Sequence, residues 1–194
     1  LPLLTAFCLN MIVKDEARVI RRCLESVRPL IDAWLIVDTG STDGTQALVR
    51  ETLKDLPGEL VERPWKNFGF NRSEAIQLAG KRADYLLFID ADEQWHVPKG
   101  YRWPELEKDC YHILHRFGEM EYQRATLAAT RLPWRFEGVL HEYLHAPVGY
   151  SLETLAGPWI HVNPDGARSQ DPDKFLKDVA ILEEALRESP EDRR

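Results

Sequence analysis

The chain has 194 residues, 44% of them hydrophobic, which is enough apolar material to form the core of one folded domain. Its 32 acidic residues outnumber 25 basic ones, and the net charge of −7 argues against nucleic acid or an anionic membrane as a partner. Cys8, Cys23 and Cys110 have neither the spacing of a zinc site nor the even number of a disulfide framework. No apolar stretch approaches the roughly 18 residues of a membrane span, so we expect a cytoplasmic protein whose only membrane contact would be peripheral.

Apolar runs alternate with helical patterns along the first half of the chain. Residues 1–13 lack the basic start and the cleavage site of a signal peptide and predict a buried strand, after which Asp15 is expected to cap a helix. Further strands are predicted at residues 34–37, 60–62 and 85–89. Helices are predicted at residues 19–27 and 73–81, and a third begins after the turn at residues 38–44 and ends at residue 53. This alternation predicts an open, mostly parallel sheet with helices on both faces, whose ligands bind beyond the carboxyl ends of the strands.

The pattern changes after residue 95. Short strands are predicted at residues 110–117, 122–130 and 159–162, separated by proline and glycine, and they indicate a smaller antiparallel portion beside the parallel sheet. A last helix is predicted to begin at Asp171 and Pro172 and to carry an apolar stripe as far as Pro190. The expected fold class is therefore α/β, with its parallel part in the first half of the chain.

Two carboxylates follow the strand predicted at residues 85–89. Asp90 and Asp92 are separated by one residue, and at the free end of a strand both side chains can turn toward one divalent cation. Carboxylate oxygens suit Mg²⁺ or Mn²⁺, and these ions usually take phosphate oxygens as further ligands. In the alternative interpretation, Asp90 caps the next turn while Asp92 and Glu93 are solvated loop charges.

Two other strand ends are predicted to bring polar groups to the same edge of the sheet. Asp38 ends the second strand, and Lys14, Asp15 and Glu16 follow the first. Carboxylates in such a crevice can accept hydrogen bonds from a nucleobase and from ribose hydroxyls. The three strand ends together therefore predict a nucleotide pocket.

Three segments resemble a known family. MIVKDEA at residues 11–17, IVDTGSTDGT at residues 36–45 and FIDADE at residues 88–93 occur in the order and spacing of glycosyltransferase family 2, which has the GT-A fold. The resemblance covers at least residues 5–95. The domain organisation that we expect from it is a GT-A domain at residues 1–170, with a nucleotide-binding half at 1–95 and an acceptor and catalytic half at 96–170, followed by a C-terminal helix at 171–194.

The resemblance also implies roles for individual residues. Asp38 is expected to bind the base, Asp90 the ribose, and Asp90 with Asp92 the metal and the diphosphate. The loop expected to line the nucleoside consists of Ile12, Val13, Lys14 and Glu16. Arg72 stands where relatives have an arginine before a helix, and its fork of donors could pair with diphosphate oxygens. Its alternative role is that of an ordinary surface arginine at a helix start.

A catalytic carboxylate is expected in the segment WRFEGVLHEY at residues 134–143, which contains Glu137 and Glu142. An inverting transfer needs a base that takes the proton of the acceptor hydroxyl as the hydroxyl attacks the anomeric carbon. The segment resembles a G-x-x-His-Glu motif of one branch of family 2, some members of which continue into tetratricopeptide repeats. This resemblance implies that Glu142 is the base.

The histidines allow a competing interpretation. The run from His141 to His145 has the His-Glu-x-x-His spacing of zinc hydrolases, in which both histidines lie on one helix. Nearby prolines and glycines and the lack of an evident third ligand argue against such a site. GT-A enzymes often supply a late histidine to their cation, and the resemblance implies this role for His161, which could instead be a structural histidine bonded to the backbone.

Together these observations predict a metal-dependent, inverting glycosyltransferase. Its donor would be a nucleoside diphosphate sugar, a UDP-sugar by resemblance, and its acceptor a hydroxyl of a glycan, a lipid or a protein. Mn²⁺ or Mg²⁺ is the expected cofactor. Retaining stereochemistry stays open because retaining GT-A enzymes share the donor half, and a zinc hydrolase or a noncatalytic nucleotide-binding scaffold are the alternative functions.

Overall fold

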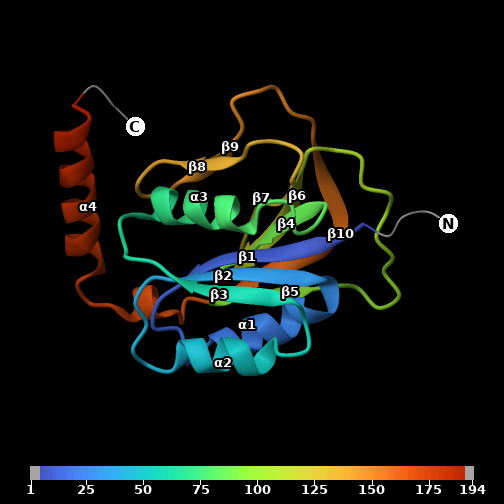
Figure 1. The fold of residues 1–194 in the computed structure, drawn as a ribbon, viewed down its shortest axis with the longest axis horizontal. Helices are drawn as coiled ribbons and strands as arrows, with labels where there is room; N and C mark the ends of the chain where they lie inside the picture. Colours follow the sequence, from blue (N-terminus) through green and yellow to red (C-terminus); the bar gives the residue numbers. More distant parts are fainter. Residues whose placement is uncertain (1–4, 191–194) are drawn as a thin grey trace.

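The structure, a computed structural model, describes residues 5–190 (Figure 1). Its centre is an eight-stranded sheet with the strand order β3-β2-β1-β4-β7-β6-β10-β5. The strands of this sheet are β1 (Phe7–Val13), β2 (Ala33–Asp38), β3 (Gly58–Glu62), β4 (Tyr85–Phe88), β5 (Glu93–His96), β6 (Cys110–Phe117), β7 (Met120–Ala129) and β10 (Leu152–Val162). A separate two-stranded sheet consists of β8 (Arg135–Glu137) and β9 (Tyr143–His145). The helices are α1 (Ile20–Val27), α2 (Thr45–Thr52), α3 (Phe68–Ala79) and α4 (Lys174–Glu188), with short 3₁₀ helices η1 (Arg28–Leu30) and η2 (Ala167–Gln170).

The part of the sheet formed by β3, β2, β1 and β4 is entirely parallel. Six of the seven residues of β1 are buried, as expected for a central strand with covered faces. Beyond β4 the direction alternates, because β7 runs antiparallel to both β4 and β6, and β5 runs antiparallel to β10. These pairings confirm the predicted α/β class with a smaller antiparallel portion, although β10 pairs with β6 in the parallel direction.

Helices cover both faces of the parallel strands (Figure 1). On one face, α1 and α2 pack their apolar residues into the larger hydrophobic core, with Leu24 and Val49 fully buried. On the other face, α3 and the β8–β9 sheet form a second core that includes Ala75 and Trp134. Because both faces are covered, a ligand reaches this part of the sheet at the ends of its strands.

Two helix starts differ from the sequence prediction. Asp15 does not cap α1, so that expectation is wrong: its backbone is left-handed (φ 54°), and its carboxylate instead accepts a hydrogen bond from the backbone N–H of Thr42. This contact and the bond from Asp15 N–H to Ser41 join the loop after β1 to the loop after β2. α3 begins earlier than predicted because the side chain of Asn67 caps it by accepting a hydrogen bond from Phe70.

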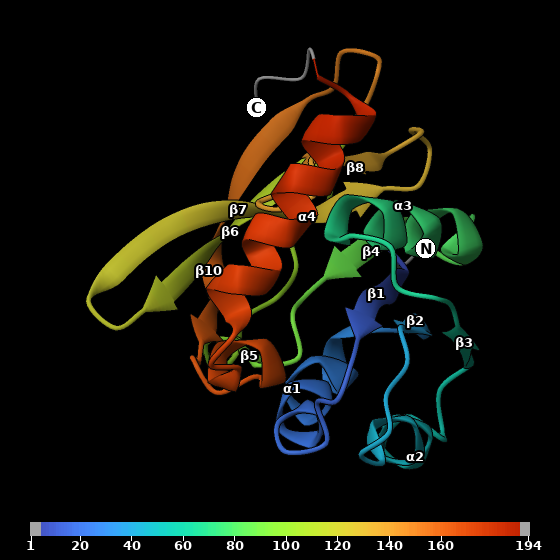
Figure 2. The same cartoon turned by 90° about the vertical axis from the view of Figure 1, so that its left-hand side faces the viewer.

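The last helix, α4, stands at the left-hand side of the molecule in Figure 1 and faces the viewer in Figure 2. It begins at Lys174, three residues later than predicted, because Asp171 is taken up by a turn and an ion pair with Lys177. Its predicted apolar stripe is exposed by 45% to 77% at Phe175, Leu176, Val179, Leu182 and Leu186. Residues 1–4 and 191–194, which the sequence assigns to a strand and to this C-terminal region, lie outside the described part of the chain. In residues 5–190 we find no helix with both the length and the apolar character that crossing a membrane requires.

A close backbone approach fixes α3 against the segment before β9. A Cβ atom placed on Gly69 of α3 would lie 2.1 Å from the carbonyl oxygen of Gly138. The hydroxyl of Ser73, one helical turn later, accepts a hydrogen bond from the N–H of Phe136 at 2.9 Å. The segment that carries Glu142 is therefore held on the first turns of α3.

We expect Gly69→Ala to destabilise the fold, because the added methyl group overlaps backbone that cannot move without shifting the whole segment. The expected loss of unfolding free energy is about 1–3 kcal/mol, measured by urea denaturation. Gly149→Ala is the matched control, since nothing lies within 4 Å of its added Cβ atom. Equal denaturation midpoints for both variants would contradict the packing described here.

Candidate functional site

Asp38, the last residue of β2, is completely buried at the carboxyl end of the sheet. Its Oδ1 atom accepts hydrogen bonds from the N–H groups of Gly40 (2.9 Å) and Ser41 (2.8 Å) and from the amide of Gln46 (3.1 Å). Burial alone would raise the pKa of Asp38, but these hydrogen bonds outweigh it and lower the pKa. The Oδ2 atom is buried and has no hydrogen-bond partner, so one acceptor atom of this carboxylate is left unsatisfied.

The loop after β1 brings Glu16 to the same region. Burial raises the pKa of Glu16 to about 7, and the negative charges of Asp92, Asp90 and Asp43 raise it further. A hydrogen bond from the backbone of Ala167 lowers this pKa but does not outweigh the burial. The carboxylate accepts this bond from the N–H of Ala167 at 3.0 Å. Glu16 therefore belongs to the same field of negative charge as Asp90 and Asp92, as the sequence predicts.

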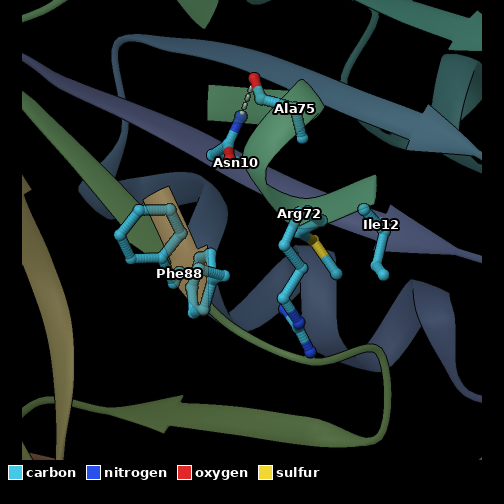
Figure 3. Close-up of a pocket in the computed structure, with 7 residues that line it drawn as sticks. Asn10, Ile12, Arg72, Ala75 and Phe88 are labelled. Atoms are coloured by element: carbon cyan, nitrogen blue, oxygen red, sulfur yellow. Dashed lines mark hydrogen bonds between the residues drawn. The ribbon is translucent and has the colours of Figure 1, made fainter. Parts of the chain in front are cut away.

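The other predicted nucleoside contacts have different surroundings. Ile12 is half-buried and lines a narrow hollow together with Arg72 and Phe88 (Figure 3). Lys14 is exposed, whereas the side chain of Val13 is buried in the larger hydrophobic core. The backbone of Val13 is the part that borders the loop after β2, where its carbonyl oxygen accepts a hydrogen bond from Thr39.

Arg72 connects two of the predicted site residues. It extends from α3 beside Ile12 (Figure 3), and its Nη2 atom donates to Oδ1 of Asp90 at 2.5 Å. Its Nε atom lies 2.7 Å from Oε1 of Glu142. The Arg72 and Glu142 side chains are only 14% and 13% exposed, so this ion pair is poorly screened by water. The structure thus brings the predicted metal ligand and the predicted base to one arginine.

A second arginine contacts Asp90, and the sequence gives no sign of it. Arg124 of β7 lies with Nη1 3.2 Å from Oδ2 of Asp90 and with Nη2 2.7 Å from Oε2 of Glu93. Burial favours a raised pKa for Asp90, but Arg72 and Arg124 outweigh it and hold the pKa well below its usual range. Burial raises the pKa of Glu93 to about 7, against the opposing influence of Arg124.

Asp92 has the opposite electrostatic character to Asp90. Burial raises its pKa to about 6, and the nearby carboxylates of Asp90 and Asp165 add to the effect. Its backbone is fixed by Asn163, whose side-chain amide donates to the Asp92 carbonyl oxygen at 3.0 Å. The charged form of the Asp92 side chain is therefore disfavoured mainly by burial, and a bound cation would stabilise it.

The carboxylate pair fits a cation that arrives with its substrate. Within residues 5–190, no three His, Cys, Asp or Glu side chains are grouped so that they could hold a metal ion. Mg²⁺ and Mn²⁺ commonly take one or two protein carboxylates and complete their coordination with phosphate oxygens and water. Asp90 and Asp92 suit this kind of site rather than an all-protein cage.

His161 lies in an aromatic cluster. Its ring packs edge-on to Trp159 of the same strand, with centroids 6.2 Å apart, and to His96 of β5 at 6.3 Å. The His96 ring is itself stacked on Trp159 at 4.1 Å. The structure does not group His161 with the two aspartates, so its role as a metal ligand remains a prediction.

The run from His141 to His145 is not helical, which removes the geometry of a zinc hydrolase. His141 has a left-handed backbone (φ 54°), whereas His145 ends the short strand β9. The Nε2 atom of His145 lies 3.8 Å from the carboxylate of Glu137. Instead of a zinc site, this strained turn places Glu142 beside Arg72.

A hollow of about 390 Å³ lies next to Asp92. Phe117 and Tyr122, at the two sides of the β6–β7 hairpin, and Lys174 of α4 contribute to its wall. Its size is within the range of small-molecule sites. The sequence does not indicate this hollow, because three separate parts of the chain form it.

Comparisons with known proteins relate part of this chain to a sequence family. Residues 8–100 match the sequence model of the family described as Glycosyl transferase family 2. A TPR repeat-containing protein of Synechococcus elongatus is 32% identical over 146 residues, covering 69% of this chain and 34% of that protein. The prophage-derived glycosyltransferase SunS of Bacillus subtilis is 25% identical over 201 residues, covering 94% of this chain and 45% of SunS. The chain thus spans less than half the length of either relative.

The fold also has a counterpart among solved structures. Residues 1–349 of S. aureus TarS, in complex with UDP-GlcNAc, superpose with a TM-score of 0.55, covering 93% of this chain and 66% of that chain at 14% identity. A likeness at this identity is evidence for the shared GT-A fold. Residues 8–100 thus resemble the Glycosyl transferase family 2 domain in sequence, and the chain has the GT-A fold.

Proposed function

We propose that this protein transfers a sugar from a UDP-sugar to a hydroxyl group of an acceptor, with inversion at the anomeric carbon. The observation that carries the proposal is the assembly of Asp38, Asp90 and Glu142 at one edge of the sheet. Asp38 offers an unpartnered acceptor atom, and Arg72 joins Asp90 to Glu142. The acceptor would be a glycan, a lipid or a protein.

The free Oδ2 atom of Asp38 favours a base that carries a ring N–H, as uracil does at N3 and guanine at N1. Because Oδ1 already accepts three bonds, Oδ2 is left to accept one from the base. The N3 atom of uracil carries a hydrogen and donates, whereas N3 of cytosine and N1 of adenine only accept. A buried carboxylate facing such an acceptor would stay unpaired, and this disfavours cytosine and adenine. TarS, which has the same fold, has been solved with UDP and with UDP-GlcNAc.

Asp90 and Asp92 are the residues that would hold a divalent cation with the donor diphosphate. Such a cation neutralises the charge that grows on the leaving diphosphate. Arg72 lies close enough to Asp90 to exchange this carboxylate for a phosphate oxygen, and its fork of donors suits that partner.

Glu142 is our candidate for the base. It is mostly buried, its Oε1 atom lies 2.7 Å from Nε of Arg72, and the left-handed residue His141 precedes it in the turn. A carboxylate in this position can take the proton of an attacking hydroxyl. The neighbouring Glu137 instead contacts Arg135 at 2.6 Å.

We further propose that the chain belongs to the branch of the family with the G-x-x-His-Glu segment, and that helical repeats follow it in the whole protein. The support is the segment itself and the relative that is named a TPR repeat-containing protein. The exposed apolar stripe of α4 is consistent with a helix that continues into further helices.

The proposed donor is tested by measuring the affinity of the protein for UDP, CDP and ADP by calorimetry in the presence of Mn²⁺. We expect UDP to bind most tightly. In Asp38→Asn the side-chain amide faces the N3–H group of uracil with either an N–H donor or an acceptor weaker than a carboxylate. UDP affinity should therefore fall about tenfold to hundredfold. The ratio of UDP affinity to CDP affinity should also decrease. Asp55→Asn, on the exposed surface pair with Arg28, is the control. An unchanged nucleotide preference in Asp38→Asn would refute the assignment.

Removal of one carboxylate from the proposed cation site should abolish metal dependence. In Asp92→Asn we expect UDP affinity in Mn²⁺ to equal the affinity in EDTA, because one of two charged ligands is lost. Circular dichroism should show an unchanged fold. The nearby Asp165→Asn variant should keep the response to Mn²⁺, since Asp165 pairs with Arg22. If Asp92→Asn still responds to Mn²⁺ like the wild type, the cation is held elsewhere.

The role of Glu142 can be separated from donor binding. We expect Glu142→Gln still to bind UDP but to release UDP from UDP-glucose or UDP-GlcNAc about 100-fold to 10,000-fold more slowly, the usual contribution of a general base. Glu137→Gln is the matched variant from the same segment. Full turnover in Glu142→Gln together with a slow Glu137→Gln would transfer the role to Glu137.

A further inference from the structure

We propose that Arg124 and Glu93 are positioning residues that hold the Asp90 carboxylate in place for the cation and diphosphate of the donor. The inference rests on the proposed function, because it assumes that Asp90 meets the donor. It assigns a part in donor binding to the β6–β7 hairpin, which belongs to the half of the chain expected to serve the acceptor.

Glu93 closes the turn that contains both aspartates. Its Oε2 atom accepts a hydrogen bond from the backbone N–H of Asp90 at 2.9 Å, and its own N–H donates to the Asp90 carbonyl oxygen at 3.0 Å. The Glu93 side chain is only 2% exposed. The residue is therefore built into the turn and is not the solvated loop charge of the alternative sequence interpretation.

Arg124 reaches this turn because of the sheet register. β7 pairs antiparallel with β4, with Leu87 opposite Leu127 and Tyr85 opposite Ala129. Continued past the end of β4, the same register places Arg124 opposite Asp90. The guanidinium then spans the two carboxylates, with 3.2 Å to Oδ2 of Asp90 and 2.7 Å to Oε2 of Glu93.

The two arginines on Asp90 differ in what anchors them. Arg72 holds Oδ1 of Asp90 from α3 and is shared with Glu142, so a diphosphate can compete for it. Arg124 holds Oδ2 and is anchored on Glu93, which is buried in the turn itself. When a donor draws Arg72 away, Arg124 would keep the Asp90 carboxylate in the orientation that the cation requires.

Arg124 could instead bind the phosphate directly or only stabilise the fold, and each of these roles predicts different UDP affinities and melting temperatures for the variants. If Arg124 bound the phosphate directly, its loss would weaken UDP binding but the loss of Glu93 would not. If the Arg124–Glu93 pair only stabilised the fold, both losses would lower the melting temperature and leave UDP affinity unchanged. A positioning role requires the loss of Arg124 and the loss of Glu93 to reduce, by a similar factor, the gain in UDP affinity that the metal ion provides.

The test measures the Kd of UDP by calorimetry in Mn²⁺ and in EDTA for wild type, Glu93→Gln, Arg124→Met and the double variant. We expect each single variant to lose about tenfold in Mn²⁺, the effect typical of groups that orient a metal ligand, and to match the wild type in EDTA. The double variant should lose no more than either single variant, because both act through Asp90. Arg124→Lys keeps the positive charge but cannot contact both carboxylates at once, so it should lose the same UDP affinity as Arg124→Met. It replaces Arg124→Met in the experiment if that variant does not fold.

Arg116→Met is the matched control. Arg116 lies on the same hairpin and pairs with Glu121 at 2.8 Å on the exposed surface, so its loss should leave UDP affinity unchanged in Mn²⁺. Wild-type affinity in Glu93→Gln, or a loss in Arg124→Met that is equally large in EDTA, would overturn the positioning role while leaving UDP binding established. If the wild type itself shows no Mn²⁺-dependent UDP binding, the proposed function fails first and this inference with it.

Discussion

The structure depends on how it accommodates several carboxylates at one edge of a sheet. Like charges at short range repel strongly, and burial weakens the screening by water. The chain compensates each carboxylate differently. Asp38 receives three hydrogen bonds on one oxygen, and Asp90 receives an arginine on each oxygen. For Glu16 and Asp92 burial raises the pKa instead, with a smaller contribution from neighbouring carboxylates, so their charged forms are the least stabilised at this edge.

This uneven compensation relates the fold to its ligand. Asp90 is compensated by an arginine on each of its oxygens. At Asp92 burial disfavours the charged form, so a bound cation would stabilise it, and a cation in turn favours an anionic partner such as a diphosphate. Both oxygens of Asp90 already contact arginines, so a cation would compete with Arg72 and Arg124 for this carboxylate unless an anionic partner takes over one of them.

The sequence predicts what is local and misses what depends on the packing of distant segments. The parallel strands and the motifs at their ends follow from apolar runs and turn residues that are contiguous in the chain. Arg124 meets Asp90 only through the register of β7 on β4, and a single arginine within a strand pattern carries no sign of that register. The strands β5, β8 and β9 are three or four residues long, too short for a periodic signal.

Two local patterns in the sequence predict contacts that the structure does not form. A carboxylate before a helix usually predicts a cap, but the side chain of Asp15 finds a better donor at Thr42 in a neighbouring loop. The His-Glu-x-x-His spacing predicts a shared helix face, but a left-handed turn at His141 and a strand at Tyr143–His145 intervene. In both cases a contact or a backbone conformation set by distant residues overrides the local pattern.

The attachment of the Glu142 segment to α3 has a thermodynamic consequence. Arg72 lies on the same helix turns that hold this segment through Gly69 and Ser73, and it is shared between Asp90 and Glu142. An acceptor that changes the charge or position of Glu142 therefore alters how strongly Arg72 is retained by Asp90, and a donor that captures Arg72 frees Glu142. If the donor and the acceptor meet these residues as proposed, linkage requires each substrate to change the affinity of the other by the same factor.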